Sequence, residues 1–211
     1  MQSEIKIKHK NNFSESFKTK IKKAIKEVLV EIEKKLGIPN LEIIIDDNSK
    51  LTIPKTGLGG SCDSDLIQIH INPNFKNIEK DIETKIKRTL SHEVHHSVRN
   101  IYFSWSEATL LEAFITEGLA DHFDIEINGG EPYPWSMALS EEESAFYLNP
   151  NSEELFSKDF DYGTWFFGDN SPKIPKWAGY SIGFKLVRDY MKKSGKSASE
   201  LVNVSSEEFL E

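Results

Sequence analysis

The stretch from residue 78 to residue 100 constrains the fold of this chain more than any other part of the sequence. It contains neither proline nor glycine. Apolar residues recur along its first half every four positions, at Ile78, Ile82, Ile86 and Leu90. This period places apolar side chains on one face of a helix. The sequence therefore predicts a long helix over about residues 78–99, with one face buried.

A strand is predicted directly before this helix. In the segment LIQIHIN at 66–72, Ile67, Ile69 and Ile71 alternate with polar residues. Such alternation is typical of a strand with one buried face. The apolar segment LEIIIDD at 41–47 predicts a second strand. The glycines and turn formers at 55–65 predict a loop.

Helices are predicted over most of the remaining chain. Residues 13–36 form an amphipathic pattern, with Ser14 or Ser16 as the N-cap. Another long helix is predicted from an N-cap at Ser106 to a stop at Gly129. Shorter helices are predicted over about 136–147, 151–157, 177–193 and 197–209, and an aromatic loop over 161–175.

The order of these elements indicates an α+β fold. We expect an N-terminal helix, a small mixed sheet, a long central helix and a mostly helical C-terminal part. A length of 211 residues fits a single domain. We expect this domain to have an N-terminal lobe of about residues 1–100 and a helical lobe of about 101–211.

Composition excludes several classes of partner. The net charge of −8 argues against nucleic acid, which needs a basic surface. No segment approaches the roughly 18–20 apolar residues that span a membrane. The first residues lack the apolar core of a secretory signal, and Cys62 is the single cysteine. We therefore expect a cytoplasmic protein without a membrane or nucleic-acid partner.

The second half of the predicted 78–99 helix contains the motif H-E-x-x-H, from His92 to His96. Helix residues four apart differ by about 40° in azimuth, so two such imidazoles can converge on one ion at about 2.0–2.1 Å. Glu93 lies about 100° round the helix, where its carboxylate can reach a metal-bound water. The alternative is a polar helix face. The apolar neighbours Leu90 and Val94 argue against it, because unpaired buried histidines are costly.

A catalytic zinc ion needs a third protein ligand and an open position. On the next predicted helix Glu117 and Asp121 are four residues apart and share a face. Glu117 is the candidate ligand, and Asp121 would accept the distal N–H of a ligating histidine. The alternative is a solvated acidic face, which the otherwise apolar helix disfavours.

These motifs resemble those of the gluzincin metallopeptidases, in which H-E-x-x-H is followed by E-x-x-x-D. The segments SHEVHH, EGLADHF and WAGYSIGFKLVRDYM are similar, more narrowly, to the YjaZ-like family of predicted zinc-dependent proteases. The resemblance covers about residues 50–195. It implies a zincin-like fold, with His92, His96 and Glu117 as zinc ligands. It also implies Glu93 as general base and Asp121 as a partner of the ligand set.

Other residues are candidates for secondary roles. Tyr180, in WAGYSIG, could donate a hydrogen bond to the developing oxyanion, or could be a packing residue. His122 and His70 could line the cleft, although a structural role is the alternative for His122. We interpret His95 as solvated or hydrogen-bonded rather than as a ligand.

Two further segments could control binding of the substrate or its access to the site. The 66–72 strand could bind an extended peptide along an exposed edge, or could be an ordinary internal strand. The 55–65 loop could cover the cleft. Within that loop, Cys62 could block the zinc as a thiolate, but an ordinary loop cysteine is the preferred interpretation.

The function predicted from the sequence is peptide-bond hydrolysis with one Zn²⁺ per chain and Glu93 as general base. The expected partner is a peptide or protein substrate. Two alternatives stay open: a metal-dependent hydrolase of a non-peptide amide or ester, and a catalytically silent zincin-like binding module.

Overall fold

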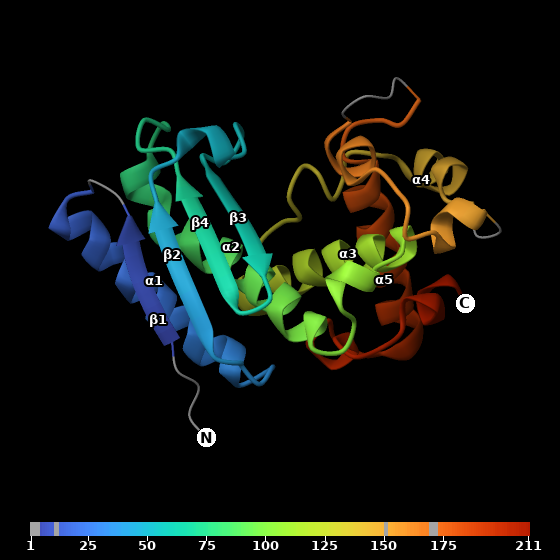
Figure 1. The fold of residues 1–211 in the computed structure, drawn as a ribbon, viewed down its shortest axis with the longest axis horizontal. Coiled ribbons are helices and arrows are strands. Elements are labelled where there is room, and N and C mark those ends of the chain that lie inside the picture. The colour runs from blue at the N-terminus through green and yellow to red at the C-terminus, as the bar shows by residue number, and fades with distance from the viewer. Residues whose placement is uncertain (1–4, 11–12, 150–151, 169–172) are drawn as a thin grey trace. The chain divides into compact units, whose positions relative to one another are not determined.

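The computed structural model of the chain describes residues 5–10, 13–149, 152–168 and 173–211. The chain forms two compact units, Met1–Ile101 and Tyr102–Glu211. Each unit has its own helices or strands, as Figure 1 shows, and its own buried residues. The architecture is α+β, as expected.

The first unit contains a four-stranded mixed sheet. Its strands are β1 (Ile5–Lys10), β2 (Leu41–Asp46), β3 (Leu58–Asp63) and β4 (Leu66–Ile71). Their order is β1-β2-β4-β3. β1 pairs with β2, and β2 with β4, in parallel, whereas β3 runs antiparallel to β4. The sheet is therefore built round the two isoleucine-rich strands, with β3 at one edge.

Two helices cover one face of this sheet. They are α1 (Glu15–Glu33) and α2 (Ile78–Asn100), and both lie behind the strands in Figure 1. Ser14 caps α1 by accepting a hydrogen bond from the backbone N–H of Phe17. The apolar stripes expected on the two helices are buried. The core of the unit includes the fully buried side chains of Ile43, Ile45, Ile67, Ile69, Ile71, Ile82, Ile86 and Leu90.

Strand β1 was not predicted from the sequence, and the interpretation of the sheet was wrong at two further points. The predicted 55–65 loop contains strand β3, which pairs with β4 from Leu58↔Ile71 to Asp63↔Leu66. Consequently the 66–72 strand is internal, so it cannot offer an exposed edge to a peptide. Gly59 suits this strand because a Cβ there would lie 2.1 Å from the backbone oxygen of Leu51, in the short 3₁₀ helix Ser49–Leu51.

The second unit is helical. Its helices are α3 (Leu110–Asn128), α4 (Glu141–Tyr147) and α5 (Ala178–Ser194). α3 begins later than predicted, because Thr109 rather than Ser106 accepts a hydrogen bond from the first turn. The helix predicted over 197–209 is instead a pair of 3₁₀ helices. Further short turns are Trp105–Glu107, Glu153–Phe156 and the π-helical turn Gly163–Phe167. The π-helical turn lies in the predicted aromatic loop. Residues 169–172 of that loop fall outside the residues that the structure describes.

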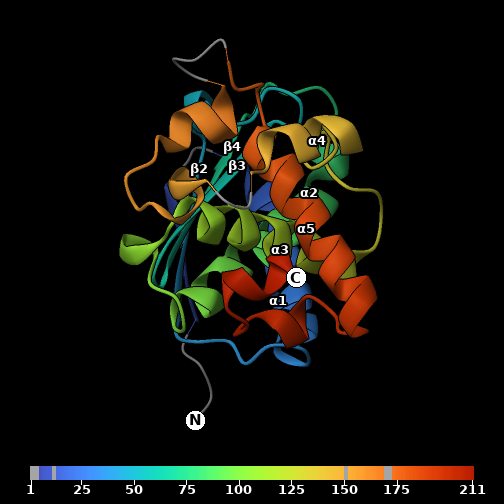
Figure 2. The same cartoon turned by 90° about the vertical axis from the view of Figure 1, so that its right-hand side faces the viewer.

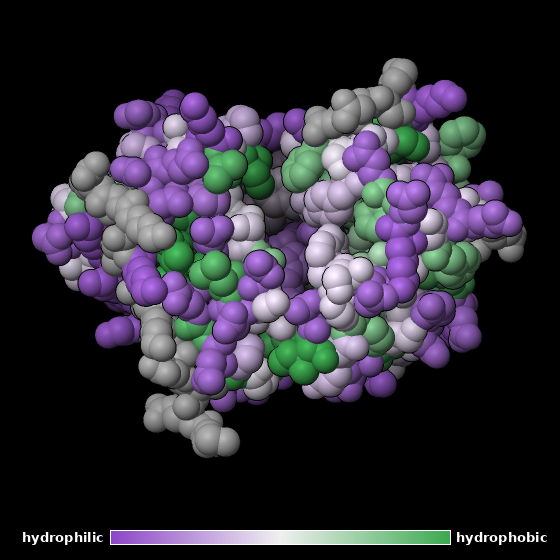
Figure 3. Space-filling model, in the orientation of Figure 1, coloured by the Kyte–Doolittle hydropathy of each residue, from purple (hydrophilic) through white to green (hydrophobic). Residues whose placement is uncertain are grey.

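Hydrophilic residues cover most of the surface visible in Figure 3, and hydrophobic residues appear there in separate groups. The large hydrophobic side chains on the surface include Phe146 and Ile101. Among the residues that the structure describes, no helix has the length and apolar character needed to cross a membrane.

α3 and α5 pack closely against each other, and Figure 2 shows α5 crossing in front of α3. Two glycines allow this approach. A Cβ at Gly118 would lie 2.3 Å from the backbone oxygen of Gly183. A Cβ at Gly183 would lie 1.9 Å from the backbone oxygen of Phe114. Both neighbours are main-chain atoms, which cannot move aside as a flexible side chain could.

Replacing Gly183 with alanine is therefore expected to destabilise the protein by about 1–3 kcal/mol, the usual cost of overpacking. The protein should lose stability even though alanine favours a helix more than glycine does. Urea unfolding, followed by circular dichroism, measures this change in the free energy of unfolding. Gly37→Ala is the matched control, because a Cβ there meets nothing within 4 Å. Equal stability of the two variants would show that the helices do not need this contact.

Candidate functional site

The histidine pair of H-E-x-x-H lies in the second half of α2. The Nε2 atoms of His92 and His96 are 2.9 Å apart, and their rings are nearly perpendicular at 88°. Two atoms that each bind one ion at about 2.0–2.1 Å must lie within about 4 Å of each other. The pair meets this condition, and both side chains are partly exposed on an otherwise buried stretch of helix. The imidazole donors therefore fit a zinc ion.

Glu93 follows His92 and is only 6% exposed. It lies beneath the edge strand β3, which packs on α2. A Cβ at Gly60 would lie 2.3 Å from Oε1 of Glu93 and 2.8 Å from the methyl carbon of Thr89. Gly60 therefore lets the strand backbone pass directly over the carboxylate. The arrangement places the candidate base beside the backbone of an edge strand.

Cys62 is also on β3, and its thiol is a free one. Burial, followed by the nearby charge of Glu93, raises the pKa of the Cys62 thiol to about 12. Its Sγ donates to the backbone oxygen of Ser64 at 3.6 Å. A thiol with this pKa is protonated at neutral pH. This protonation state applies to the metal-free protein, because a bound zinc would itself lower the pKa of a coordinating thiol. The interpretation of Cys62 as an ordinary cysteine therefore stays a prediction.

Two other histidines of this unit, His70 and His95, are buried. His95 is fully buried, so the solvated alternative for it was wrong. His70, 6% exposed, lies on β4 with Nδ1 2.8 Å from Oδ1 of Asp46, its partner in the β2–β4 register. Because His70 is paired with a carboxylate inside the sheet, the structure indicates a structural role for it.

Glu117 and Asp121 lie on α3 in the second unit. They are 6% and 2% exposed, so the alternative of a solvated acidic face was wrong. Asp121 accepts hydrogen bonds from the hydroxyl of Ser136 at 2.6 Å and, more weakly, from the indole of Trp135 at 3.5 Å. Buried carboxylates need such donors. These contacts fix the orientation of the Asp121 carboxylate.

Tyr162 is a residue that the sequence argument missed. Its hydroxyl donates to Oε1 of Glu117 at 2.8 Å, across 45 residues of sequence. Burial, followed by the charge of Glu117, raises the pKa of Tyr162 well above its ordinary value, so the hydroxyl stays a neutral donor. The predicted aromatic loop contained Tyr162, but its composition did not indicate which ring faces α3.

Tyr180 lies in the first turn of α5, among the same aromatic residues. Its ring contacts Phe166 edge to face, with centroids 5.0 Å apart. Tyr180 also contributes to the raised pKa of Tyr162, partly through a hydrogen bond between the two side chains. The structure therefore joins Tyr180, Tyr162 and Glu117 in one polar chain within the second unit.

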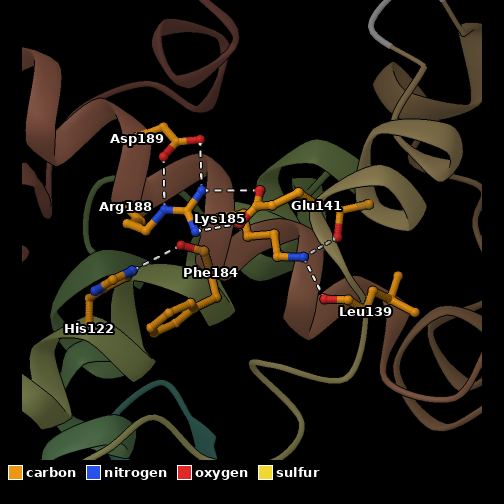
Figure 4. A network of polar contacts seen from close by, with 8 residues as sticks. His122, Leu139, Glu141, Phe184, Lys185, Arg188 and Asp189 are labelled. Carbon is orange, nitrogen blue, oxygen red and sulfur yellow. Dashed lines mark hydrogen bonds and ion pairs between the residues drawn. The ribbon is translucent and has the colours of Figure 1, made fainter.

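His122 is held between α3 and α5. Its Nε2 donates to the backbone oxygen of Phe184 at 2.9 Å, and its ring stacks on that of Phe184 at 3.9 Å (Figure 4). Burial lowers its pKa, which keeps the imidazole neutral. The Nε2–H group is thus used in helix packing rather than offered to a substrate.

Polar contacts also anchor α5 to the segment round α4. The ammonium group of Lys185 donates to the backbone oxygen of Leu139 at 2.5 Å and to the hydroxyl of Ser144 at 2.8 Å. Arg188 binds both carboxylate oxygens of Glu141, as Figure 4 shows. These bonds hold the middle of α5 against the segment round α4.

Comparisons with known proteins identify the family to which this chain belongs. A family model described as "Predicted Zn-dependent protease (DUF2268)" matches residues 17–211, which include every candidate site residue. The chain is 27% identical to the uncharacterized protein YjfC of Bacillus subtilis over 78% of its own length. It is 26% identical to the uncharacterized protein YjaZ of the same organism over 60% of its length.

The aligned regions cover 57% of YjfC and 50% of YjaZ, so the chain spans about half the length of these relatives. No solved structure matches it significantly. The resemblance to the YjaZ-like family is confirmed by the family model and by both relatives. On this evidence the chain belongs to the family of predicted Zn-dependent proteases.

Proposed function

We propose that this protein hydrolyses peptide bonds with a zinc ion, in the manner of a gluzincin with a zincin-like fold. The observation that carries the proposal is the convergence of His92 and His96, with Nε2 atoms 2.9 Å apart, directly beside the buried Glu93. Family membership supports it, because that family is described as predicted Zn-dependent proteases. The proposal treats the two units as one functional domain.

The proposed ligands are His92, His96 and Glu117, with one zinc ion per chain. Two imidazoles and a carboxylate are a donor set that suits zinc and leaves a position for water. Asp121 would accept the distal N–H of a ligating histidine, which fixes its tautomer. When bound, zinc would lower the pKa of a water molecule and polarise the scissile carbonyl.

Glu93 is the proposed general base. Its carboxylate takes a proton from the attacking water, so that the oxygen can add to the scissile carbonyl carbon. As the C–N bond breaks, Glu93 returns this proton to the leaving nitrogen. The products are a new carboxylate and a new amine. Tyr180 is the proposed neutral donor to the oxyanion of the addition step.

Strand β3 is the proposed guide for the substrate. It is the edge strand of the sheet on the side away from β1, and Gly60 brings its backbone over Glu93. An extended peptide can add to such an edge through main-chain hydrogen bonds. A peptide bound in this way would have its scissile bond next to Glu93. Because the contacts are made by backbone atoms, this binding does not require a particular substrate sequence.

Gly60→Ala tests this arrangement. The new Cβ would meet Oε1 of Glu93, so the carboxylate must shift while the histidines stay in place. We expect turnover to fall by about 10²-fold, the cost of misplacing a catalytic group by about 1 Å. Zinc content, measured by mass spectrometry, should not change. Gly37→Ala, the same chemical change at a position where a Cβ meets nothing within 4 Å, is the control. Unchanged turnover in the Gly60 variant would contradict this placement of Glu93.

The main alternative is hydrolysis of a non-peptide amide or ester by the same groups. A panel of small esters and amides, assayed beside a diverse peptide pool with zinc-loaded protein, separates the two functions. Cleaved peptides with an inert small-molecule panel support the peptidase. Turnover of esters or amides alone favours the alternative. Stoichiometric zinc with no turnover of either kind would indicate a silent binding module.

A further inference from the structure

We propose that Tyr162 is a positioning residue that holds the Glu117 carboxylate in the orientation needed to bind metal. The inference rests on the proposed zinc site, since it assigns Tyr162 a role through one of that site's ligands. Nothing in the sequence motifs selects Tyr162. Its assignment comes from the 2.8 Å hydrogen bond to Oε1 of Glu117.

The hydrogen bond is directed by a rigid local structure. Tyr162 directly precedes the π-helical turn Gly163–Phe167, a kind of turn often found at functional sites. Asp161 fixes the start of this turn by accepting from the backbone N–H of Thr164 at 3.1 Å and from its hydroxyl at 2.8 Å. The indole of Trp165 donates to Glu154 at 3.2 Å. Hydrogen bonds at Thr164 and Trp165 therefore hold the first part of the turn in place.

The ring of Tyr162 is packed as well. It stacks on Phe166, with centroids 4.2 Å apart, and meets Trp105 edge to face at 5.7 Å. Phe166 is fully buried, so this platform is part of the core of the second unit. A ring held on such a platform can direct its hydroxyl at one carboxylate oxygen with little loss of side-chain freedom.

The consequence for metal binding follows from the chemistry of a carboxylate. Each of its two oxygens can accept hydrogen bonds or bind a metal. A donor fixed on Oε1 limits rotation of the carboxylate, so it sets the direction in which Glu117 would present its oxygens to zinc. Partners that hydrogen-bond to metal ligands typically change metal affinity by about 10–100-fold when they are removed.

The test is the zinc affinity of Tyr162→Phe, measured on metal-free protein by competition with a chromophoric chelator. The variant keeps the ring and removes only the hydroxyl. We expect its zinc affinity to fall by about 10–100-fold. Tyr190→Phe is the matched control, because Tyr190 lies on the same unit and packs against Phe209. It should bind zinc as the wild type does.

A second comparison shows whether Tyr162 acts through Glu117. In a Glu117→Gln background, removing the Tyr162 hydroxyl should lower zinc affinity by much less than it does in the wild type. An equal loss in both backgrounds would overturn the inference, as would an unchanged affinity of Tyr162→Phe in a wild-type background. Absence of zinc binding by the wild type would instead reject the proposed function.

Should Tyr162→Phe fail to fold, Asp161→Ala carries the test. Asp161 is exposed, and its loss loosens the turn that presents Tyr162 without removing the hydroxyl. This variant should bind zinc more weakly than the wild type. The melting temperature of its metal-free form should be nearly that of the wild type. Wild-type zinc affinity in Asp161→Ala would contradict the inference.

Discussion

Glu93→Gln is expected to lower kcat/KM for a cleaved peptide by about 10²–10⁴-fold, the usual contribution of a general base. Glutamine has nearly the size of glutamate, so it should fit beneath β3 as Glu93 does. It cannot accept the proton of the attacking water. Because Glu93 is not a proposed ligand, the variant should keep one zinc per chain. Steady-state kinetics and metal analysis on the same preparation measure both quantities.

Glu79→Gln is the matched control for this prediction. Glu79 is an exposed residue in the first turn of the same helix, so the chemical change is identical and its position is remote. It should retain wild-type kinetics. If Glu93→Gln were as active as this control, Glu93 would not be the base, and the proposed mechanism would fail even with zinc present.

His92→Ala is expected to lose zinc altogether, or nearly so, and activity with it. Removing one of three ligands leaves two, too few for a catalytic site. Thermal unfolding detects the loss of zinc binding without an activity assay. At free zinc 100 times above Kd, binding adds about 2.7 kcal/mol of stability, or roughly 5–10 °C in a chain of this length. The wild type should show this rise in melting temperature, and His92→Ala should not.

Lys80→Ala, at an exposed position on the same helix, controls for a general effect of alanine on α2. It should show the wild-type rise with zinc. The account would be contradicted if His92→Ala retained stoichiometric zinc at wild-type affinity, because the pair His92–His96 would then not be the metal centre.

The helices were predictable because their signals are local. The spacing of Ile78, Ile82 and Ile86 is enough to place α2, since a buried stripe is repeated within a few residues. The strand β4 was found in the same way from its alternating isoleucines. Boundaries were less certain: Ser106 and Thr109 both suit an N-cap, and packing of the following residues decided for Thr109.

The edge strand was missed because its pairing is not local. Glycine disfavours strands, so Gly59 and Gly60 indicated a loop. Both glycines are in fact required by close neighbours, the backbone of Leu51 and the carboxylate of Glu93. Those neighbours cannot be read from the segment itself. The strand β1 was missed for a related reason, since alternation with lysines gives it little hydrophobic signal.

The residues of the candidate site likewise fall into those that a local sequence pattern predicts and those that depend on long-range contacts. His92, Glu93 and His96 were found because one helical turn contains them all. Glu117 and Asp121 were proposed because they repeat that spacing, and their burial agrees with a role other than solvation. Tyr162 could not be found, because its contact with Glu117 spans 45 residues and depends on how the π-helical turn meets α3.

The central claim is that zinc in this protein drives hydrolysis of peptide bonds. It is tested most directly by mass spectrometry of a diverse peptide pool incubated with zinc-loaded, chelator-treated and zinc-restored protein. The account predicts new peptide termini with the first and third samples, none with the second, and almost none with zinc-loaded Glu93→Gln. An intact pool in the presence of one bound zinc per chain, or equal cleavage after complete removal of metal, would contradict it.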